Sequence, residues 1–185
     1  MILLPPGPFD VVFADPPWRF ASNSAAKPGR SARQHYDCMP LDEICDLPVS
    51  SVAARSALLL VWVTVPFAAA ADEVIRAWGF RYKSQLVWPK QRIGTGYWAR
   101  NQHELLLIAT RGRFPCPRPA LFPTSLIPGL QREHSRKPEW PQDVIDARLP
   151  GTRRLELFGR RPRVGWTIWG NQAAKFEAVG EEVLS

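Results

Sequence analysis

The sequence has few cysteines, and their spacing forms no pairs. Cys38, Cys45 and Cys116 are odd in number, so a disulfide framework is not expected. Pro66 interrupts the longest apolar run, "SALLLVWVTVPFAAAA", which is therefore too short to span a membrane. The start, "MILLPPGPF", lacks the basic residues and the long apolar stretch of a signal peptide. These absences predict an intracellular, cytoplasmic protein without a membrane segment.

Metal ligands are also scarce. His35, His103 and His134 are too scattered to form a ligand set, and His35 with Cys38 and Cys45 lacks a fourth ligand. We therefore expect no metal site. The composition, 45% hydrophobic and 22% charged residues, is typical of a globular protein, and 185 residues predict one domain over 1–185.

Acidic residues are nearly missing from two stretches of this basic chain, whose net charge is +7. The segment from Arg81 to Lys137 holds eleven basic residues and two acids, Glu104 and Glu133, a net charge of +9. Residues 17–33 hold four basic residues and no acid. Such segregation favours a surface that faces nucleic acid over an evenly solvated one.

Strand and helix patterns alternate along the chain. We expect strands over 9–14, 57–64, 81–90, 103–112, 153–159 and 164–170, and helices over 41–48, 66–79, 139–149 and 171–184. Residues 19–34 and 91–102 are expected to be loops, and the proline-rich stretch 113–141 to be irregular. The pattern predicts a three-layer α/β fold with a mostly parallel sheet, in which 81–90 and 103–112 form a hairpin.

The motif "DPPW" (Asp15 to Trp18) follows the first predicted strand. Prolines cannot donate ladder hydrogen bonds, so the sheet has to stop there. The motif is either an ordinary strand-ending turn or the floor of a pocket, with a fixed carboxylate and an aromatic side chain.

Other polar residues follow later predicted strands. Glu156 and Gly159 come at the end of one strand, Asn171 and Gln172 follow another, and Lys137 precedes a helix. Ligands of open α/β sheets bind beyond the carboxyl ends of the strands, so these residues are expected to converge. Taken alone, an Asn-Gln pair is more often an ordinary helix start.

Seven blocks carry a resemblance to a known family. They are "DVVFADPPW", "LLLVWVT", "WGFRYKSQLVWPK", "GYWARNQHELLLIATRG", "EHSRKPE", "PGTRRLELFGRR" and "GWTIWGNQ". In this order they resemble the MT-A-type (DPPW) adenine-N6 methyltransferases, especially the short bacterial and phage members, over residues 9–172. The resemblance implies a Rossmann-like class I methyltransferase fold with the catalytic block before the cofactor block. It also implies S-adenosylmethionine as methyl donor and association as homo- or heterodimers.

The resemblance also assigns roles to single residues. Asp15 and the carbonyl of Pro16 would accept the two N–H bonds of the adenine amine, Pro17 would stiffen the bend, and Trp18 would wall the flipped base. The residues expected at the cofactor are Asp15, Lys137, Glu156, Leu157, Arg160, Asn171 and Gln172. Those expected at the substrate are Trp18, Arg19, Tyr97, Trp98, Asn101, His103 and Arg136. Two alternatives remain open: Arg160 could contact phosphate as part of "RRPR", and Tyr97 and Trp98 could anchor their loop to the core.

Three functions follow from these patterns. The first is methyl transfer to N6 of adenine in nucleic acid, with DNA favoured over RNA for a short microbial type. The second is a catalytically silent, nucleic-acid-binding partner subunit, which the intact DPPW motif disfavours. The third is methyl transfer to a small molecule or a protein, which the segregated basic segments disfavour.

Eukaryotic members carry a histidine and an asparagine after the "ELFGR"-like block, where this sequence has "RPRVGW".

Overall fold

The computed structural model describes residues 3–18, 38–96, 98–115, 117–130 and 136–170. The loop expected over 19–34 and the helix expected over 171–184 lie outside these residues.

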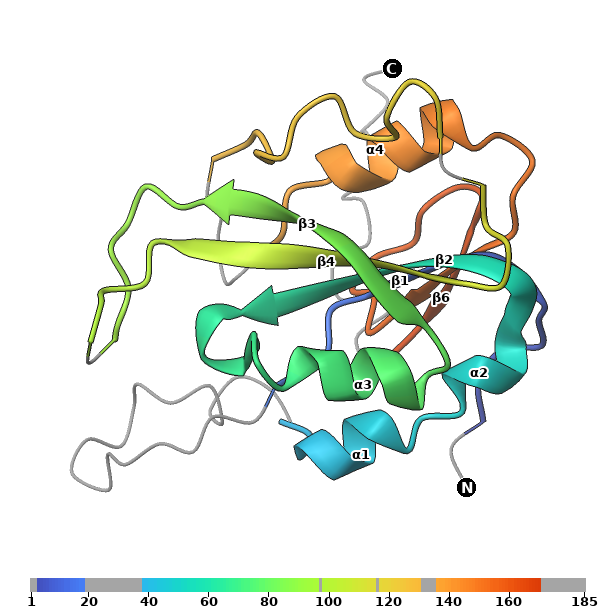
Figure 1. Ribbon diagram of the computed structural model, residues 1–185, viewed down its shortest axis with the longest axis horizontal. Helices are drawn as coiled ribbons and strands as arrows, with labels where there is room; N and C mark the ends of the chain where they lie inside the picture. Colours follow the sequence, from blue (N-terminus) through green and yellow to red (C-terminus); the bar gives the residue numbers. More distant parts are fainter. Residues whose placement is uncertain (1–2, 19–37, 97, 116, 131–135, 171–185) are drawn as a thin grey trace, which may run out of the picture.

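Six strands form a single sheet in the order β3-β4-β2-β1-β5-β6 (Figure 1). Their bounds are β1 Phe9–Ala14, β2 Ala53–Thr64, β3 Arg81–Pro89, β4 His103–Arg111, β5 Arg154–Leu157 and β6 Trp166–Trp169. β1 pairs in parallel with β2 and β5, and β5 pairs in parallel with β6. β4 is antiparallel to both of its neighbours, β2 and β3. The predicted mostly parallel sheet and its hairpin are thus confirmed.

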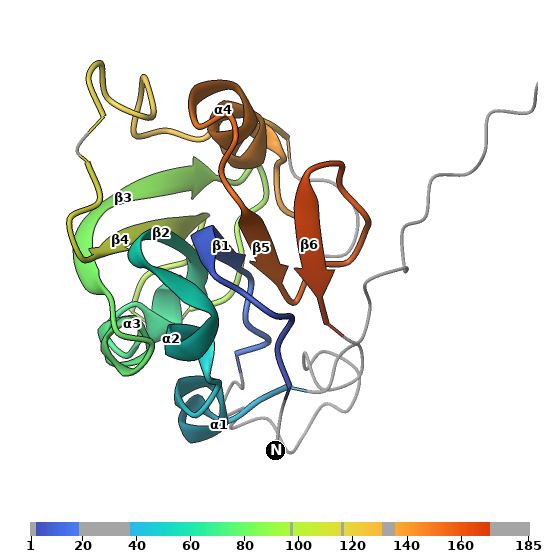
Figure 2. The same cartoon turned by 90° about the vertical axis from the view of Figure 1, so that its right-hand side faces the viewer.

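Helices cover both faces of this sheet. α1 (Leu41–Cys45), α2 (Val49–Val52) and α3 (Ala71–Ala77) lie on one face, and α4 (Trp140–Arg148) lies on the other (Figure 2). Side chains of a strand alternate between faces, so Leu59 and Val61 of β2 pack with the first group of helices, while Leu60 and Trp62 pack on the α4 side. The three-layer α/β prediction is confirmed.

The helix predicted over 66–79 is divided in two. A 3₁₀ turn, η2 (Val65–Phe67), carries Pro66, and α3 begins only at Ala71. Gly79 has φ +82°, a conformation that glycine adopts without steric cost, and it ends the helix as predicted. The one-turn helix α2 was not predicted, because four residues are too few to show a helical period.

The proline-rich segment is irregular where it is described, yet it contributes to the core. Leu121, Phe122 and Ile127 are buried on the α4 side of the sheet. The segment is held along β3 by a bridge between Val87 and Leu126, and the indole N–H of Trp88 donates to a carbonyl of this segment. It thus covers a part of the sheet that α4 leaves open.

Candidate active site

Asp15 lies directly after β1, where the parallel strands end. Its backbone N–H donates to the carbonyl of Leu157, at the end of β5, over 3.3 Å. The chain then turns: Trp18 N–H donates to the Pro16 carbonyl, and Met39 N–H donates to the Pro17 carbonyl, each over 2.9 Å. The sheet therefore stops at the two prolines, as predicted. A carbonyl oxygen has two lone pairs, so that of Pro16 can accept a further hydrogen bond.

Trp18 fixes this turn from within the core. Its side chain is 5% exposed, its indole N–H donates to the carbonyl of Trp62 over 3.0 Å, and its ring stacks on Phe67 with centroids 5.4 Å apart. The sequence resemblance predicts that Trp18 contacts the substrate base. To stack on a base, this side chain would have to leave the core.

Lys137 joins two carboxylates. Its Nζ donates to both oxygens of Asp15, over 2.8 and 2.9 Å, and lies 3.3 Å from an oxygen of Glu104, at the start of β4. Glu104 is also paired with Lys90, just after β3. Asp15, Lys137, Glu104 and Lys90 therefore form a row of alternating charge that links the ends of β1, β3 and β4.

Neighbouring charges stabilise the ionised forms of Lys137 and Glu104. Burial by itself disfavours the charge on Lys137, but Asp15 and Glu104 outweigh that effect and raise its pKa above the usual value. Burial likewise disfavours the charge on Glu104, yet Lys137 and Lys90 outweigh it and lower its pKa. Each buried charge thus depends on its neighbours.

Glu156 lines the same cavity wall as Asp15. It pairs with Phe13 in the register of β5 with β1, and the side-chain amide of Gln142 in α4 donates to it over 2.9 Å. Burial raises the pKa of Glu156 from 4.5 to about 7, although the hydrogen bond from Gln142 opposes this shift. Glu156 is therefore partly protonated near neutral pH.

A cavity of about 70 Å³ lies beside Asp15, Lys137 and Glu156. The lining residues are Phe13, Asp15, Trp62, Arg136, Lys137, Glu139, Gln142, Glu156, Phe158, Arg160 and Arg161. This volume is far below the roughly 300–1,000 Å³ of sites that take drug-sized ligands. The long cationic side chains at the rim would therefore have to move to admit one.

The loop after β5 carries two of these cations to the cavity. Phe158 has φ +64°, which is rare for a residue with a side chain, and its N–H donates to the carbonyl of Trp169 in β6 over 2.6 Å. The loop then places Arg160 4.0 Å from Asp15 and pairs Arg161 with Glu139. Backbone strain of this kind is often kept at functional sites.

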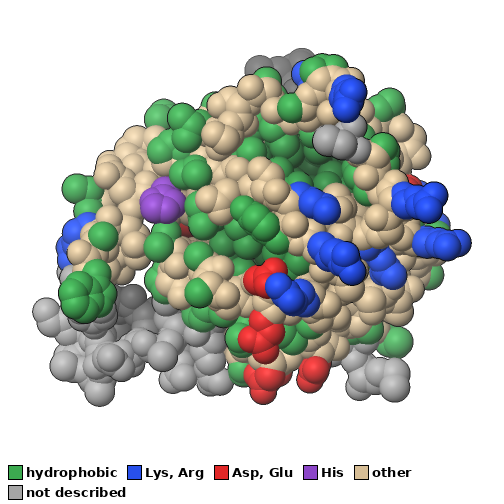
Figure 3. Space-filling model, in the orientation of Figure 1, with side chains coloured by type: hydrophobic (Ala, Val, Ile, Leu, Met, Phe, Trp, Pro, Cys, Tyr) green, Lys and Arg blue, Asp and Glu red, His purple; other side chains and the backbone are tan. Residues whose placement is uncertain are grey.

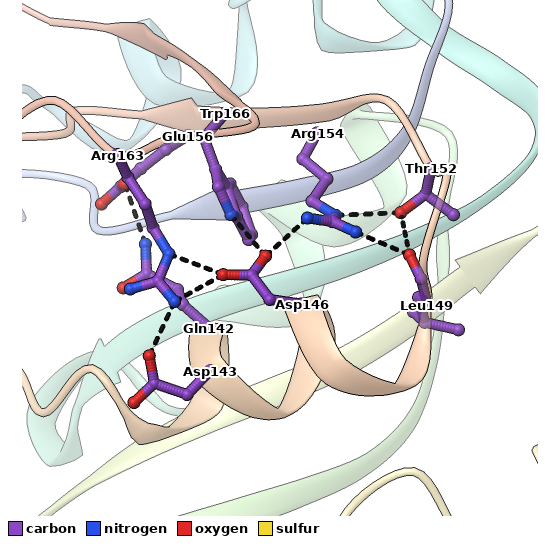
Figure 4. A network of polar contacts seen from close by, with 9 residues as sticks. All are labelled: Gln142, Asp143, Asp146, Leu149, Thr152, Arg154, Glu156, Arg163 and Trp166. Atoms are coloured by element: carbon purple, nitrogen blue, oxygen red, sulfur yellow. Dashed lines mark hydrogen bonds and ion pairs between the residues drawn. The ribbon is translucent and has the colours of Figure 1, made fainter.

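Arg163 ties the same loop to α4 (Figure 4). It donates to Asp146 and Asp143, and Asp146 also accepts bonds from Arg154 at the start of β5 and from the indole of Trp166 in β6. Gln142, one turn earlier in α4, reaches Glu156. One helix thus holds both the loop and the wall of the cavity.

The remaining predicted residues are divided between several places. Arg136 lines the cavity and pairs with Glu139, whereas the side chain of Leu157 is fully buried in the core on the other face. Trp98 is fully exposed, which contradicts the alternative that it anchors its loop to the core. Asn101 bonds within that loop through its backbone, and His103 is exposed at the start of β4. Arg19, Tyr97, Asn171 and Gln172 lie outside the described residues.

Eight residues of the cavity wall and the charged row were not among the predictions. They are Phe13, Trp62, Lys90, Glu104, Glu139, Gln142, Phe158 and Arg161. Glu104 did carry a signal, because it is one of two acids in a segment with eleven basic residues. Gln142 carried none, since one amide in a helix is ordinary.

Other candidate sites are weaker. A larger hollow of about 940 Å³ lies between α3 and the β3–β4 hairpin, and it is lined by none of the predicted site residues. The described residues hold no cluster of three or more potential metal ligands. Nor do they hold a helix with the length and apolar character to cross a bilayer.

Comparison with known proteins agrees with the sequence resemblance. The family model MT-A70 matches residues 9–172. The type II methyltransferase M.MunI of Mycoplasma sp is 32% identical, and the match covers 90% of this chain and 78% of that protein. The N(6)-adenosine-methyltransferase MT-A70-like protein of Arabidopsis thaliana is 30% identical, over 95% of this chain and 25% of its own length. The human N(6)-adenosine-methyltransferase catalytic subunit METTL3 is 29% identical, and the match covers 97% of this chain and 30% of that protein. This chain thus spans less than a third of these two eukaryotic relatives.

Proposed function

The chain belongs to the MT-A70 family, and on that basis we propose that it transfers a methyl group from S-adenosylmethionine to the N6 amine of adenine in nucleic acid. The observation that carries the proposal is Asp15, held by Lys137 at the end of β1 in a cavity between charged side chains. Relatives named as N(6)-adenosine-methyltransferases support it.

The side chains at the cavity fit such a donor. S-adenosylmethionine carries a carboxylate, an ammonium and a sulfonium group, and when bound it supplies an electrophilic methyl group. Lys137 and Arg160 offer cations to the carboxylate, while Glu156 offers an acceptor to the positive groups. The buried indole N–H of Trp62, which also lines the cavity, has no hydrogen-bond partner within the described residues and is a donor that a ligand can satisfy.

Asp15 and Pro16 act on the amine. The lone pair of an adenine amine is delocalised into the ring, so the nitrogen is a poor nucleophile. The Asp15 carboxylate and the second lone pair of the Pro16 carbonyl accept the two N–H bonds, which turns the lone pair toward the methyl group. The proton that the methylated amine sheds passes through Asp15 to solvent. Trp18 contributes from the core, because it holds the bend that aims these two acceptors.

DNA is the nucleic acid that we propose as substrate. Of the three relatives compared above, the type II methyltransferase M.MunI is covered over most of its length, at 78%. The eukaryotic relatives named for adenosine methylation have long additional segments that this chain does not match.

A direct test uses cofactor with a deuterated methyl group and oligonucleotides of matched sequence. Single- and double-stranded DNA and RNA are incubated with the protein, and the digested nucleosides are identified by mass spectrometry. We expect deuterated N6-methyladenine, more from DNA than from RNA, and no label when every adenine is replaced by cytosine. Binding of the oligonucleotides without transfer to any of them would instead support the silent partner subunit.

A further inference from the structure

A second group of cations gathers at the end of the sheet away from Asp15. They are Arg55 in β2, Arg81 and Lys83 in β3, Arg111 in β4 and Arg113 just after it. We call these five residues the far-end cluster. Figure 3 shows Lys and Arg side chains gathered on the right-hand part of this face, with the acidic side chains of the view grouped below them.

The register of the strands brings the cluster together. Arg111 stands opposite Ala57 of β2, Arg81 stands opposite Thr110 of β4, and the N–H of Arg113 donates to Ser56. A register shift between Tyr82 and Ser84 places Lys83 at an irregularity of the ladder. Three neighbouring strands thus carry cations at the same end of the sheet, with Arg81 and Arg111 on opposite faces.

The cluster is remote from the cavity. Glu104 marks the active-site end of β4 and Arg111 the other end. Seven residues of an antiparallel strand separate them by about 24 Å. A ligand held at Asp15 therefore reaches the far-end cluster only if it is a long molecule.

The charges of the cluster are uncompensated, unlike those at the cavity. In the part of the chain that the structure describes, none of the five forms an ion pair, whereas Lys137, Lys90, Arg161 and Arg163 all do. Four of the five are exposed, and Arg111 is half-buried, where it donates to the carbonyl of Ser50 and lies over the ring of Phe80. Unpaired like charges at one end of the sheet repel each other, so a polyanion that binds them relieves this repulsion.

We propose that the far-end cluster binds the phosphate backbone of the nucleic acid whose adenine occupies the active site. The inference rests on the proposed function for the identity of the ligand. A nucleic acid rises 3.4 Å per nucleotide step along its axis, so about seven steps of B-form span the distance to the cavity. Contacts of this kind are independent of base sequence, and they raise affinity without choosing the target.

A membrane surface suits the cluster less well. Binding at a bilayer interface requires apolar side chains beside the cations. Among the described residues, Tyr82 is the one exposed large apolar side chain beside the far-end cluster, and the nearby Ser56, Ser84 and Gln85 are polar. Tyr82, between Arg81 and Lys83, instead offers a ring on which an unpaired base can stack.

The test compares two triple variants with the unmodified protein. Arg81→Gln, Lys83→Gln and Arg113→Gln together remove three charges, and Arg81→Lys, Lys83→Arg and Arg113→Lys keep them. Affinity for a single-stranded DNA of about 20 nucleotides is measured without cofactor at several salt concentrations, because each phosphate contact adds about 0.7 to the slope of log affinity against log salt. We expect the neutral variant to lose at least about tenfold in affinity at low salt and about 2 in slope. The charge-conserving variant is expected to keep both.

Each other outcome is decisive. A neutral variant with the original affinity and slope overturns the inference, as does an equal loss in the charge-conserving variant. Loss of binding to phosphatidylserine vesicles with unchanged binding to DNA overturns it in favour of a membrane. If the neutral variant does not fold, as judged by circular dichroism, Lys83→Gln alone is used and should lower the slope by about 0.7. Because binding is measured without cofactor, a protein that transfers no methyl group but shows the slope change would refute the proposed function alone.

Discussion

At the scale of single residues, the site depends on a carboxylate that does not itself line the cavity. Glu104 is 4% exposed and pairs with both Lys90 and Lys137. It holds Lys137 where that residue can reach Asp15, so it is a positioning residue. Removal of one partner from a buried ion pair leaves an uncompensated charge, which costs more than an exposed pair contributes.

Glu104→Gln tests this role. We expect a loss of about 3 kcal/mol in the free energy of unfolding, measured by urea denaturation, and a lower transfer rate. We also expect Glu104→Asp, which keeps the charge, to restore part of the rate. Glu43→Gln makes the same chemical change at an exposed position of α1 and should alter neither quantity. An unchanged rate in a folded Glu104→Gln protein would remove Glu104 from the positioning of Lys137.

Glu156 makes the stability of the folded protein depend on pH. Its carboxyl binds a proton more tightly in the folded protein, with a pKa of about 7, than at the ordinary value of 4.5. Its contribution to stability is therefore fully present below about pH 4.5 and is lost as the pH rises through 7. The shift corresponds to roughly 3 kcal/mol. The groups that act on it are Asp15, Gln142, Arg161 and Arg163.

Glu156→Gln should flatten that dependence. Urea unfolding at pH 5 and pH 8 is expected to show a smaller loss of stability with rising pH in the variant than in the unmodified protein. Glu104, Lys137 and the other shifted groups remain in both proteins, so the difference isolates Glu156. Parallel pH profiles would show that Glu156 is ionised in the folded protein across this range.

At the scale of elements, α4 organises the second half of the site. Asp146 accepts bonds from Arg154, Arg163 and Trp166, which belong to β5, the following loop and β6 (Figure 4). The sequence "RPR" (residues 161–163) therefore has a structural use, because its last residue, Arg163, fastens the loop that carries Arg160.

We call the bonds of Asp146 to Arg154, Arg163 and Trp166 the α4 clamp. Two substitutions in α4 compare its contribution to stability with that of an exposed carboxylate. Asp146→Ala leaves the largely buried Arg154 and Arg163 without their main partner, and we expect a loss of about 3 kcal/mol in urea unfolding. Asp143→Ala removes a carboxylate whose side chain is 61% exposed, and the cost should be below about 1 kcal/mol. Equal losses of stability in the two variants would show that the α4 clamp contributes no more than an exposed ion pair.

The elements themselves were largely predictable, since buried parallel strands are continuously apolar and prolines and glycines mark their ends. Residues 9–14 matched β1, whereas the strand predicted from Ala57 begins at Ala53, because its first residues lack an apolar pattern. The site was predicted as far as it lies at strand ends. Gln142 and Arg161 were missed because they come from a helix and a loop whose approach depends on tertiary packing.

At the scale of the whole molecule, the basic segment from Arg81 to Lys137 is not one surface. Because β3 and β4 are antiparallel, the segment passes from the far end to the active-site end and back. Lys90 and Lys137 lie at the site, and Arg81 and Arg111 lie at the opposite edge. The sequence could indicate the charge excess, but only the pairing of strands divides it into a part at the candidate active site and a far-end cluster.

Methyl transfer by Asp15→Asn is the sharpest test of whether Asp15 activates the amine. This substitution keeps the shape of the side chain and removes its charge, while Lys137 keeps its contact with Glu104. We predict nearly unchanged affinity for S-adenosylmethionine by calorimetric titration, and at least a roughly 100-fold slower formation of N6-methyladenine by mass spectrometry. Formation at close to the original rate in a folded variant would contradict the claim that Asp15 activates the amine.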